Sequence, residues 1–178
     1  MPLHDSASPD AAGDVTIRPA TPDDLAAIGR LGAMLVGWHH DLDPKRFVAP
    51  TRGTPAGYAS FLGSQLDQAD VVVLVAADGS DVLGYAYATV EGRDWMSLRG
   101  PAGVLQDIIV DPERRRHGVG RKLLDGTVAV LRARGVPQVV LSTATQNLSA
   151  QRLFASAGFR STMIEMTRDM DEDQSKRR

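Results

Sequence analysis

A strand, a glycine-containing loop and a helix follow one another in the middle of the chain, and this order constrains the fold and its chemistry most. Residues 106–110 end an apolar strand pattern, residues 115–120 read Arg-Arg-His-Gly-Val-Gly, and apolar side chains then recur at helical spacing through residue 131. Backbone amides at a helix start lack partners within the helix, and the helix dipole makes that end electropositive. Glycines at 118 and 120 let an anion approach those amides, and the arginines add positive charge. The segment therefore predicts a cradle for phosphate groups.

Two common nucleotide-binding loops do not fit this segment. The third glycine of a dinucleotide-binding fingerprint would fall at Leu123, and no acid ends the next strand pattern at residues 139–143. A P-loop needs Gly-Lys followed by Ser or Thr, which the segment lacks. The remaining alternatives are a tight turn without a ligand and an arginine face exposed to solvent.

The rest of the chain predicts one domain with a mixed α/β fold. The order of elements is β-α-α-β-β-β-α-β-α-β, in which consecutive middle strands favour an antiparallel meander and the later strand-helix-strand unit favours parallel pairing. We expect the domain at residues 15–168, between flexible tails at residues 1–14 and 169–178. The predicted strands are residues 15–18, 71–77, 82–91, 104–110, 138–142 and 161–167, and the predicted helices are residues 21–38, 54–66, 119–135 and 149–157.

Composition excludes several classes of function. The net charge of −2 argues against a protein that binds nucleic acid through bulk charge. The chain has no cysteine, which excludes disulfides, zinc-thiolate sites and a thiol nucleophile and fits a reducing compartment. No apolar run approaches the ~20 residues of a membrane-spanning helix, and the N-terminus lacks the pattern of a signal peptide. We therefore expect a cytoplasmic protein that binds neither nucleic acid nor membrane.

Residues 108–124 resemble the central motif of the GCN5-related N-acetyltransferase (GNAT) superfamily, an Arg/Gln-x-x-Gly-x-Gly/Ala loop between a strand and a helix. Three further segments are similar to motifs of that family in the same order: residues 17–24, 141–147 and 150–159. The resemblance covers residues 15–168. It implies a GNAT-type central twisted sheet, with an antiparallel N-terminal meander and a splayed parallel pair, flanked by about four helices.

The same resemblance implies a function. The expected enzyme is an acetyl-CoA-dependent N-acetyltransferase in which a primary amine of a small molecule or peptide attacks the thioester directly. The alternative is a catalytically weak, acyl-CoA-binding regulatory module. The resemblance also suggests a homodimer, and it calls for no metal.

The residues implied to hold acetyl-CoA form three groups along the chain. Backbone groups of one strand would pair with the pantetheine arm, and the amide of Ile109 or Val110 would stabilise the oxyanion. The loop and the start of the next helix would hold the pyrophosphate, and two residues near the following helix would contact the arm and the thioester sulfur. In chain order these residues are Ile108, Ile109 and Val110; Arg115, Arg116, His117, Gly118, Val119, Gly120 and Arg121; and Asn147 and Phe154.

Proton transfer is the step for which the sequence offers alternatives. An alkyl ammonium has a pKa of about 10.4, so the enzyme must help to remove a proton at neutral pH. Asp107, three residues before the end of its strand, is the first candidate for the base, and a structural salt bridge is its alternative role. Glu91 is the second candidate, unless it ends a hairpin in solvent. Phe154 replaces the tyrosine that many members use to protonate the thiolate, so water, Tyr85 or Tyr87 would have to serve, or the thiolate would leave as such.

The acceptor pocket of the family lies beside the loop after the first helix and the long hairpin. Here this implies Trp38, His39 and Trp95 as acceptor-binding residues, with a surface or capping role as the alternative for His39 and a dimer contact for Trp95. His39 and His40 do not predict a metal site, because adjacent residues on a helix point about 100° apart.

Overall fold

A five-stranded mixed sheet forms the centre of the protein. The computed structural model describes residues 15–170; the predicted tails fall on residues 1–14 and 171–178, outside the described residues, apart from positions 169 and 170. The strands lie in the order β1-β2-β3-β4-β5, with β1 to β4 antiparallel and β4 parallel to β5. Their bounds are β1 Thr16–Pro19, β2 Val71–Asp78, β3 Asp81–Glu91, β4 Ala102–Val110 and β5 Val139–Leu141. The predicted meander followed by a parallel pair is confirmed.

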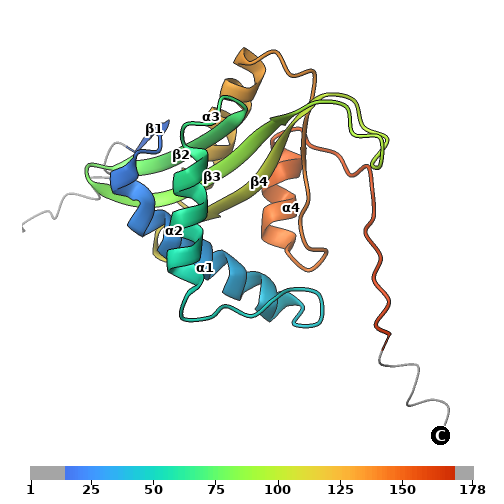
Figure 1. Cartoon of the computed structure of the whole chain (residues 1–178), viewed down its shortest axis with the longest axis horizontal. Coiled ribbons are helices and arrows are strands. Elements are labelled where there is room, and N and C mark those ends of the chain that lie inside the picture. Colours follow the sequence, from blue (N-terminus) through green and yellow to red (C-terminus); the bar gives the residue numbers. More distant parts are fainter. Residues whose placement is uncertain (1–14, 171–178) are drawn as a thin grey trace, which may run out of the picture.

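Four helices cover the two faces of this sheet. Figure 1 shows α1 (Leu25–Leu42) and α2 (Thr54–Gln65) crossing one face, where Ile28, Leu31 and Leu62 are fully buried against β2 and β3. The opposite face carries α3 (Val119–Ala133) and α4 (Leu148–Ser156), which contribute to a second apolar cluster. Because both faces are covered, β2 is apolar from Val71 to Ala77 instead of alternating. Short 3-10 turns precede α1 at Pro22–Asp24 and follow β4 at Pro112–Arg114.

The start of α1 is fixed by the motif that predicted it. The side chain of Asp24 accepts hydrogen bonds from the backbone amide and hydroxyl of Thr21, at 2.8 and 3.0 Å. Arg18 of β1 donates to both carboxylate oxygens of Asp24 at 2.7 and 2.8 Å, and this contact lowers the pKa of Asp24 to about 2. The predicted helix start is confirmed, with one 3-10 turn ahead of the α-helix.

A β-bulge in β4 determines which side chains reach each face near its end. Tyr87 of β3 lies opposite Asp107, whereas the next residue, Ala88, lies opposite Leu105, so Gln106 is the extra residue of the bulge. Leu105 therefore packs on the α3 side, and Ile109 packs on the side of α1 and α2. Without the bulge, strict alternation would have placed residues 105, 107 and 109 on the same face.

The prediction of a final strand at residues 161–167 is wrong. These residues are exposed and belong to no strand of the sheet. Alternating side chains indicate an extended chain with one apolar side, but a strand also needs a hydrogen-bonded neighbour, and the segment has none within residues 15–170. In that same range, no helix is both long and apolar enough to cross a membrane.

Candidate active site

The parallel pair β4–β5 separates toward the end of β4. Its pairing covers Gly103–Val139, Val104–Val140 and Leu105–Leu141, and β4 then runs on for five residues past the last of these pairs. An added Cβ on Gly120 would lie 3.6 Å from Val110 and 3.7 Å from Leu153 of α4, so α3 and α4 come close to the end of β4. Figure 1 shows α4 standing beside this end of the strand. Past Leu105, β4 therefore has no partner strand on its β5 side, and the family resemblance assigns the pantetheine arm to this part of its backbone.

The loop after β4 leads into α3 through two residues with left-handed backbone angles. Arg116 and Gly118 both adopt left-handed backbone angles, with φ of 68° and 77°. The first hydrogen bond of α3 runs from the amide of Lys122 to the carbonyl of Gly118 at 3.0 Å, so the amides of Val119, Gly120 and Arg121 precede it. A Cβ at position 118 would meet open space, which means that the positive φ and not crowding favours glycine there. Alternating left-handed residues and a helix start form the concave arrangement of amides that binds anions.

The charged side chains predicted around the pyrophosphate divide into two groups. Arg115 donates from Nε to the carbonyl of Val110 at 3.2 Å, and its guanidinium lies 4.7 Å from the ring centre of Trp38. Arg121 bonds both oxygens of Asp125 and the carbonyl of Ser156. Arg115 thus holds the loop against β4 and α1, and Arg121 holds α3 against α4. The side chains of Arg116 and His117 are exposed.

The two remaining predicted cofactor residues lie on or beside α4. Asn147 caps this helix, because its side-chain oxygen accepts from the amide of Ala150 at 3.2 Å. Phe154 is 6% exposed and packs edge-on against Phe159, with ring centres 6.0 Å apart. Phe154 belongs to the same apolar cluster as Val110 at the end of β4.

Asp107 lies on the opposite face, with two tyrosines around its carboxylate. Tyr85 of β3 donates its hydroxyl at 3.1 Å, and Tyr58 of α2 is a second donor. Burial raises the pKa of Asp107, and the two hydroxyls and the charge of His39 oppose that rise without cancelling it. Burial and the charge of Asp107 raise the pKa of Tyr58 to about 12, and they raise that of Tyr85 as well. The tyrosines therefore stay protonated donors at neutral pH, while the carboxyl group is a better proton acceptor than an exposed aspartate.

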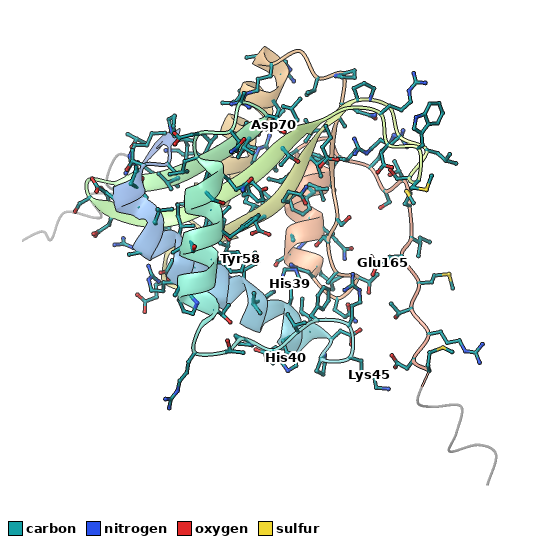
Figure 2. The ribbon with its side chains drawn as sticks, viewed as in Figure 1. His39, His40, Lys45, Tyr58, Asp70 and Glu165 are labelled. Atoms are coloured by element: carbon teal, nitrogen blue, oxygen red, sulfur yellow. The ribbon has the colours of Figure 1, made fainter. Side chains whose placement is uncertain are left out.

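Tyr58 was not predicted as a site residue. Figure 2 places it on α2, in front of the sheet. Its ring packs directly against Gly32 of α1, where an added Cβ would overlap the ring. A glycine inside an otherwise good helix pattern is the only sequence signal of this contact.

A cavity of about 400 Å³ opens beside Asp107. Three of its six lining residues are aromatic, and the rings of Phe61 and Tyr87 meet edge-on with centres 5.8 Å apart. Aromatic faces next to a carboxylate attract an ammonium group and cover the carbon chain that bears it. The lining residues are Gly57, Tyr58, Phe61, Tyr87, Gln106 and Asp107.

The other predicted catalytic and acceptor-binding residues are not among those that line this cavity. Glu91 forms an ion pair with Arg99 at 2.6 Å and accepts from Gln106 at 3.3 Å, so it belongs to a polar network on the β3–β4 hairpin. His39 bonds the carbonyl of Leu35 through Nδ1 at 2.9 Å, and Figure 2 shows it below Tyr58. Trp95 is 67% exposed on the same hairpin.

Comparisons with known proteins agree with this geometry. The family model described as "Acetyltransferase (GNAT) family" matches residues 61–159. The chain therefore belongs to the GNAT acetyltransferase family. It is 42% identical over 73 residues to a mycothiol acetyltransferase of Thermobispora bispora; this match covers 41% of the chain and 23% of that relative, so the chain spans less than a quarter of the relative's length.

Two solved structures have the same fold at low sequence identity. A Bacillus halodurans protein described as a transcriptional regulator is 20% identical, with a TM-score of 0.69 over 88% of this chain and 99% of that one. A Clostridium acetobutylicum protein described as a predicted acetyltransferase, solved with acetyl-CoA, is 14% identical, with a TM-score of 0.66 over 89% and 97% of the two chains. These likenesses confirm the predicted fold class.

Proposed function

We propose that the protein is an acetyl-CoA-dependent N-acetyltransferase that acetylates a primary amine of a small molecule or peptide. The observation that carries this proposal is the position of Asp107. Its carboxyl group has a raised pKa, borders an aromatic cavity and lies three residues before the end of the strand beside the opening. An amine in that cavity would meet a proton acceptor close to the place where the family resemblance puts the thioester.

Acetyl-CoA would lie on the other side of the end of β4. The amides at the start of α3 suit its pyrophosphate, and the unpaired part of β4 suits the amides of its pantetheine arm. In this proposal Arg116, His117 and Gly118 flank the pyrophosphate directly, whereas Arg115 and Arg121 hold the loop and the two helices in place. The bound thioester supplies an activated acetyl group.

Asp107 would act as the base for the attacking amine. The amine arrives as an ammonium with a pKa of about 10.4, and its proton passes to the carboxylate, directly or through water. The amine nitrogen then bonds to the carbonyl carbon and gives its second proton to water, and the carbon–sulfur bond breaks to leave a neutral amide. The backbone amide of Ile109 or Val110 would stabilise the oxyanion between these events. Because Phe154 offers no proton, the sulfur leaves as a thiolate, which a thiol pKa of about 8.5 permits.

The proposal also covers the cellular location and the partners of the enzyme. Acetyl-CoA is made inside cells, and a chain without cysteine fits a reducing compartment. Both points favour a cytoplasmic enzyme. We also propose that the protein acts as a homodimer and that its partner in the reaction is an amine, with neither nucleic acid nor membrane.

One feature favours a second candidate function. Phenylalanine at position 154 removes the proton donor that many family members carry, which is compatible with a regulatory module that binds acyl-CoA with little turnover. The raised pKa of Asp107 beside the cavity favours the enzyme over this candidate.

A thiol-release assay tests the proposal cleanly, because the chain has no cysteine and every thiol released comes from CoA. Wild type and Asp107→Asn are compared against polyamines, aminoglycosides, amino acids and peptides, and CoA affinity is measured for both by calorimetry. We expect turnover of at least one acceptor class by the wild type only, with equal CoA affinity. Tight CoA binding without turnover of any acceptor would support the regulatory module, and absence of CoA binding would contradict both candidates.

A further inference from the structure

The cavity beside Asp107 combines one carboxylate with open apolar surface. Asp107 carries the one carboxylate among the six lining residues. Phe61 of α2 is 51% exposed although its ring meets that of Tyr87, so much of this ring is free to contact a ligand. An added Cβ on Gly57 would meet no atom within 4 Å, so the cavity has room beside this turn of α2. The cavity therefore suits an apolar group that carries one positive charge.

Two further carboxylates lie near the cavity without lining it. Burial raises the pKa of the Tyr87 hydroxyl, and the charges of three carboxylates add to that rise: those of Asp107, Asp70 and Glu91. Glu91 is already paired with Arg99 at 2.6 Å, and Asp70 is exposed outside the lining. A ligand with several ammonium groups would thus leave all but one of them inside the cavity without a counter-ion, which is unfavourable.

Gln106 brings a second polar group to the same cavity. Consecutive residues of a regular strand point to opposite faces of the sheet, yet Gln106 and Asp107 both line this cavity. The bulge in β4 accounts for this, because Gln106 is its extra residue and has no partner in β3. The bulge thus places an amide group next to the carboxylate that would accept the proton.

Hydrogen bonds to the β3–β4 hairpin determine which end of this amide is available. The nitrogen Nε2 of Gln106 donates to Glu91 and to the hydroxyl oxygen of Thr89, both at 3.3 Å. A carboxylate only accepts hydrogen bonds, so the nitrogen end of the amide has to face Glu91. Thr89 gives its own hydrogen to Glu91 at 2.8 Å, and Arg99 occupies the other carboxylate oxygen at 2.6 Å. Both amide hydrogens of Gln106 are used, and its side-chain oxygen has no partner within residues 15–170.

We propose that the acceptor is an arylalkylamine, a primary amine with one positive charge and a flat apolar body. This inference rests on the proposed function and narrows its substrate class. The amine nitrogen would lie between the carboxylate of Asp107 and the side-chain oxygen of Gln106, and the ring of the acceptor would pack against Phe61 and the open side of Gly57. Gln106 is then an acceptor-binding residue, and Glu91 and Arg99 are positioning residues that orient its amide.

A comparison of amines tests the substrate class. Initial rates of thiol release are measured with phenylethylamine, propylamine, putrescine, kanamycin and an alanine tripeptide. We expect the highest kcat/KM for phenylethylamine, about tenfold or more above each of the others, because only this amine fills the apolar surface with a single charge. Preference for putrescine, kanamycin or the tripeptide would overturn this inference and leave the proposed function standing.

Absence of turnover with every amine would contradict the proposed function, and binding then decides the class of ligand separately. Calorimetry in the presence of CoA needs no reaction. Binding of phenylethylamine more tightly than putrescine or kanamycin would support the assignment of the cavity, and the reverse order would overturn it.

Filling the space at position 57 tests where the ring lies. Gly57→Leu improves the helix propensity of α2 and places a side chain in the open space, so the protein should stay folded. We expect kcat/KM to fall about tenfold or more for phenylethylamine and to stay within about threefold for propylamine. Gly57→Ala is the matched control and should retain most of the activity with both. An equal loss for the two amines would contradict the placement of the ring.

Gln106→Met tests the second polar contact, because methionine keeps the length of the side chain and removes its oxygen. We expect KM for phenylethylamine to rise about tenfold, the value of one hydrogen bond to a charged group, with kcat within about threefold of the wild type. Gln138→Met is the matched control, since Gln138 is exposed at the start of β5 and should leave both constants unchanged. An unchanged KM in Gln106→Met, or a fall confined to kcat, would contradict the contact.

Discussion

The two sides of the end of β4 are built in different ways. On the side of α1 and α2, the site consists of side chains whose burial changes their acidity: Asp107, its two tyrosine donors and the aromatic wall. On the side of α3, it consists mainly of the backbone amides at the start of the helix, after a loop in which Arg116 and Gly118 have left-handed backbone angles. In the proposed reaction the first side removes a proton and the second holds the anion of the co-substrate. Changes on one side should therefore leave the other side intact.

Asp107→Asn should have the largest effect. Removing the base should lower kcat at neutral pH by roughly 10²–10⁴-fold, the usual contribution of general base catalysis. The defect should shrink at high pH, where the amine loses its proton without help. Steady-state rates from pH 6 to 10 check this expectation, with CoA affinity as the control. A wild-type rate at every pH would remove Asp107 from the mechanism.

A negative charge at position 118 should affect only the α3 side, where it should weaken CoA binding. Asp and Asn both tolerate the left-handed backbone there, and the position has open space around it. Gly118→Asp places a carboxylate beside the proposed pyrophosphate, which should weaken CoA binding about tenfold or more, whereas Gly118→Asn should retain most of the affinity. Calorimetry with CoA measures the difference. Equal affinity in the two variants would argue against a cradle at this loop.

Tyr85→Phe should shift a pH profile and leave CoA affinity unchanged. The hydroxyl of Tyr85 lowers the pKa of Asp107, so its removal should raise that pKa further. The acidic limb of kcat/KM should then move to higher pH. Tyr87→Phe is the control, because its hydroxyl is not among the donors to Asp107. If the acidic limb of the profile does not shift, the carboxyl group of Asp107 does not determine its position.

The smallest effect should appear in stability. Because burial raises the pKa of Asp107 in the folded state, the stability that this group contributes is present below about pH 3.8, the ordinary value, and is lost as the pH rises through the folded pKa. Asp107→Asn avoids this loss, so its Tm at pH 7 should exceed that of the wild type by a few degrees. Calorimetry should show the two Tm values converging toward pH 4. A less stable variant at pH 7 would contradict a raised pKa.

The two sides also differ in how far the sequence predicts them. The loop after β4 is local: its glycines, its arginines and the helix start lie within a few residues, so pattern and spacing identify it. The cavity depends on contacts between distant segments, such as Tyr58 of α2, Gly32 of α1 and Asp107 of β4. The bulge at Gln106 was also not predicted, because a register shift depends on the partner strand. Asp107 was predicted as a candidate, but its tyrosine donors emerge only from the fold.

The same distinction explains the element that was predicted wrongly. Residues 161–167 have the alternating pattern of a strand, but such a pattern does not say which strand would pair with them, and they have no paired neighbour within residues 15–170. The other predicted strands each have a partner in the sheet: β2, β3 and β4 follow one another, β5 pairs with β4 across one helix, and β1 pairs with β2 across α1 and α2. The cofactor residues from Ile108 to Phe154 remain a prediction from the family resemblance.

A crystal structure with CoA tests most directly the claim that the two sides of β4 have separate roles. We expect the pyrophosphate within hydrogen-bond distance of the amides of Val119 and Gly120, the pantetheine arm along residues 106–110, and its sulfur near the cavity beside Asp107. Pyrophosphate bound away from this loop, or CoA filling the aromatic cavity between α2 and β3, would contradict the account.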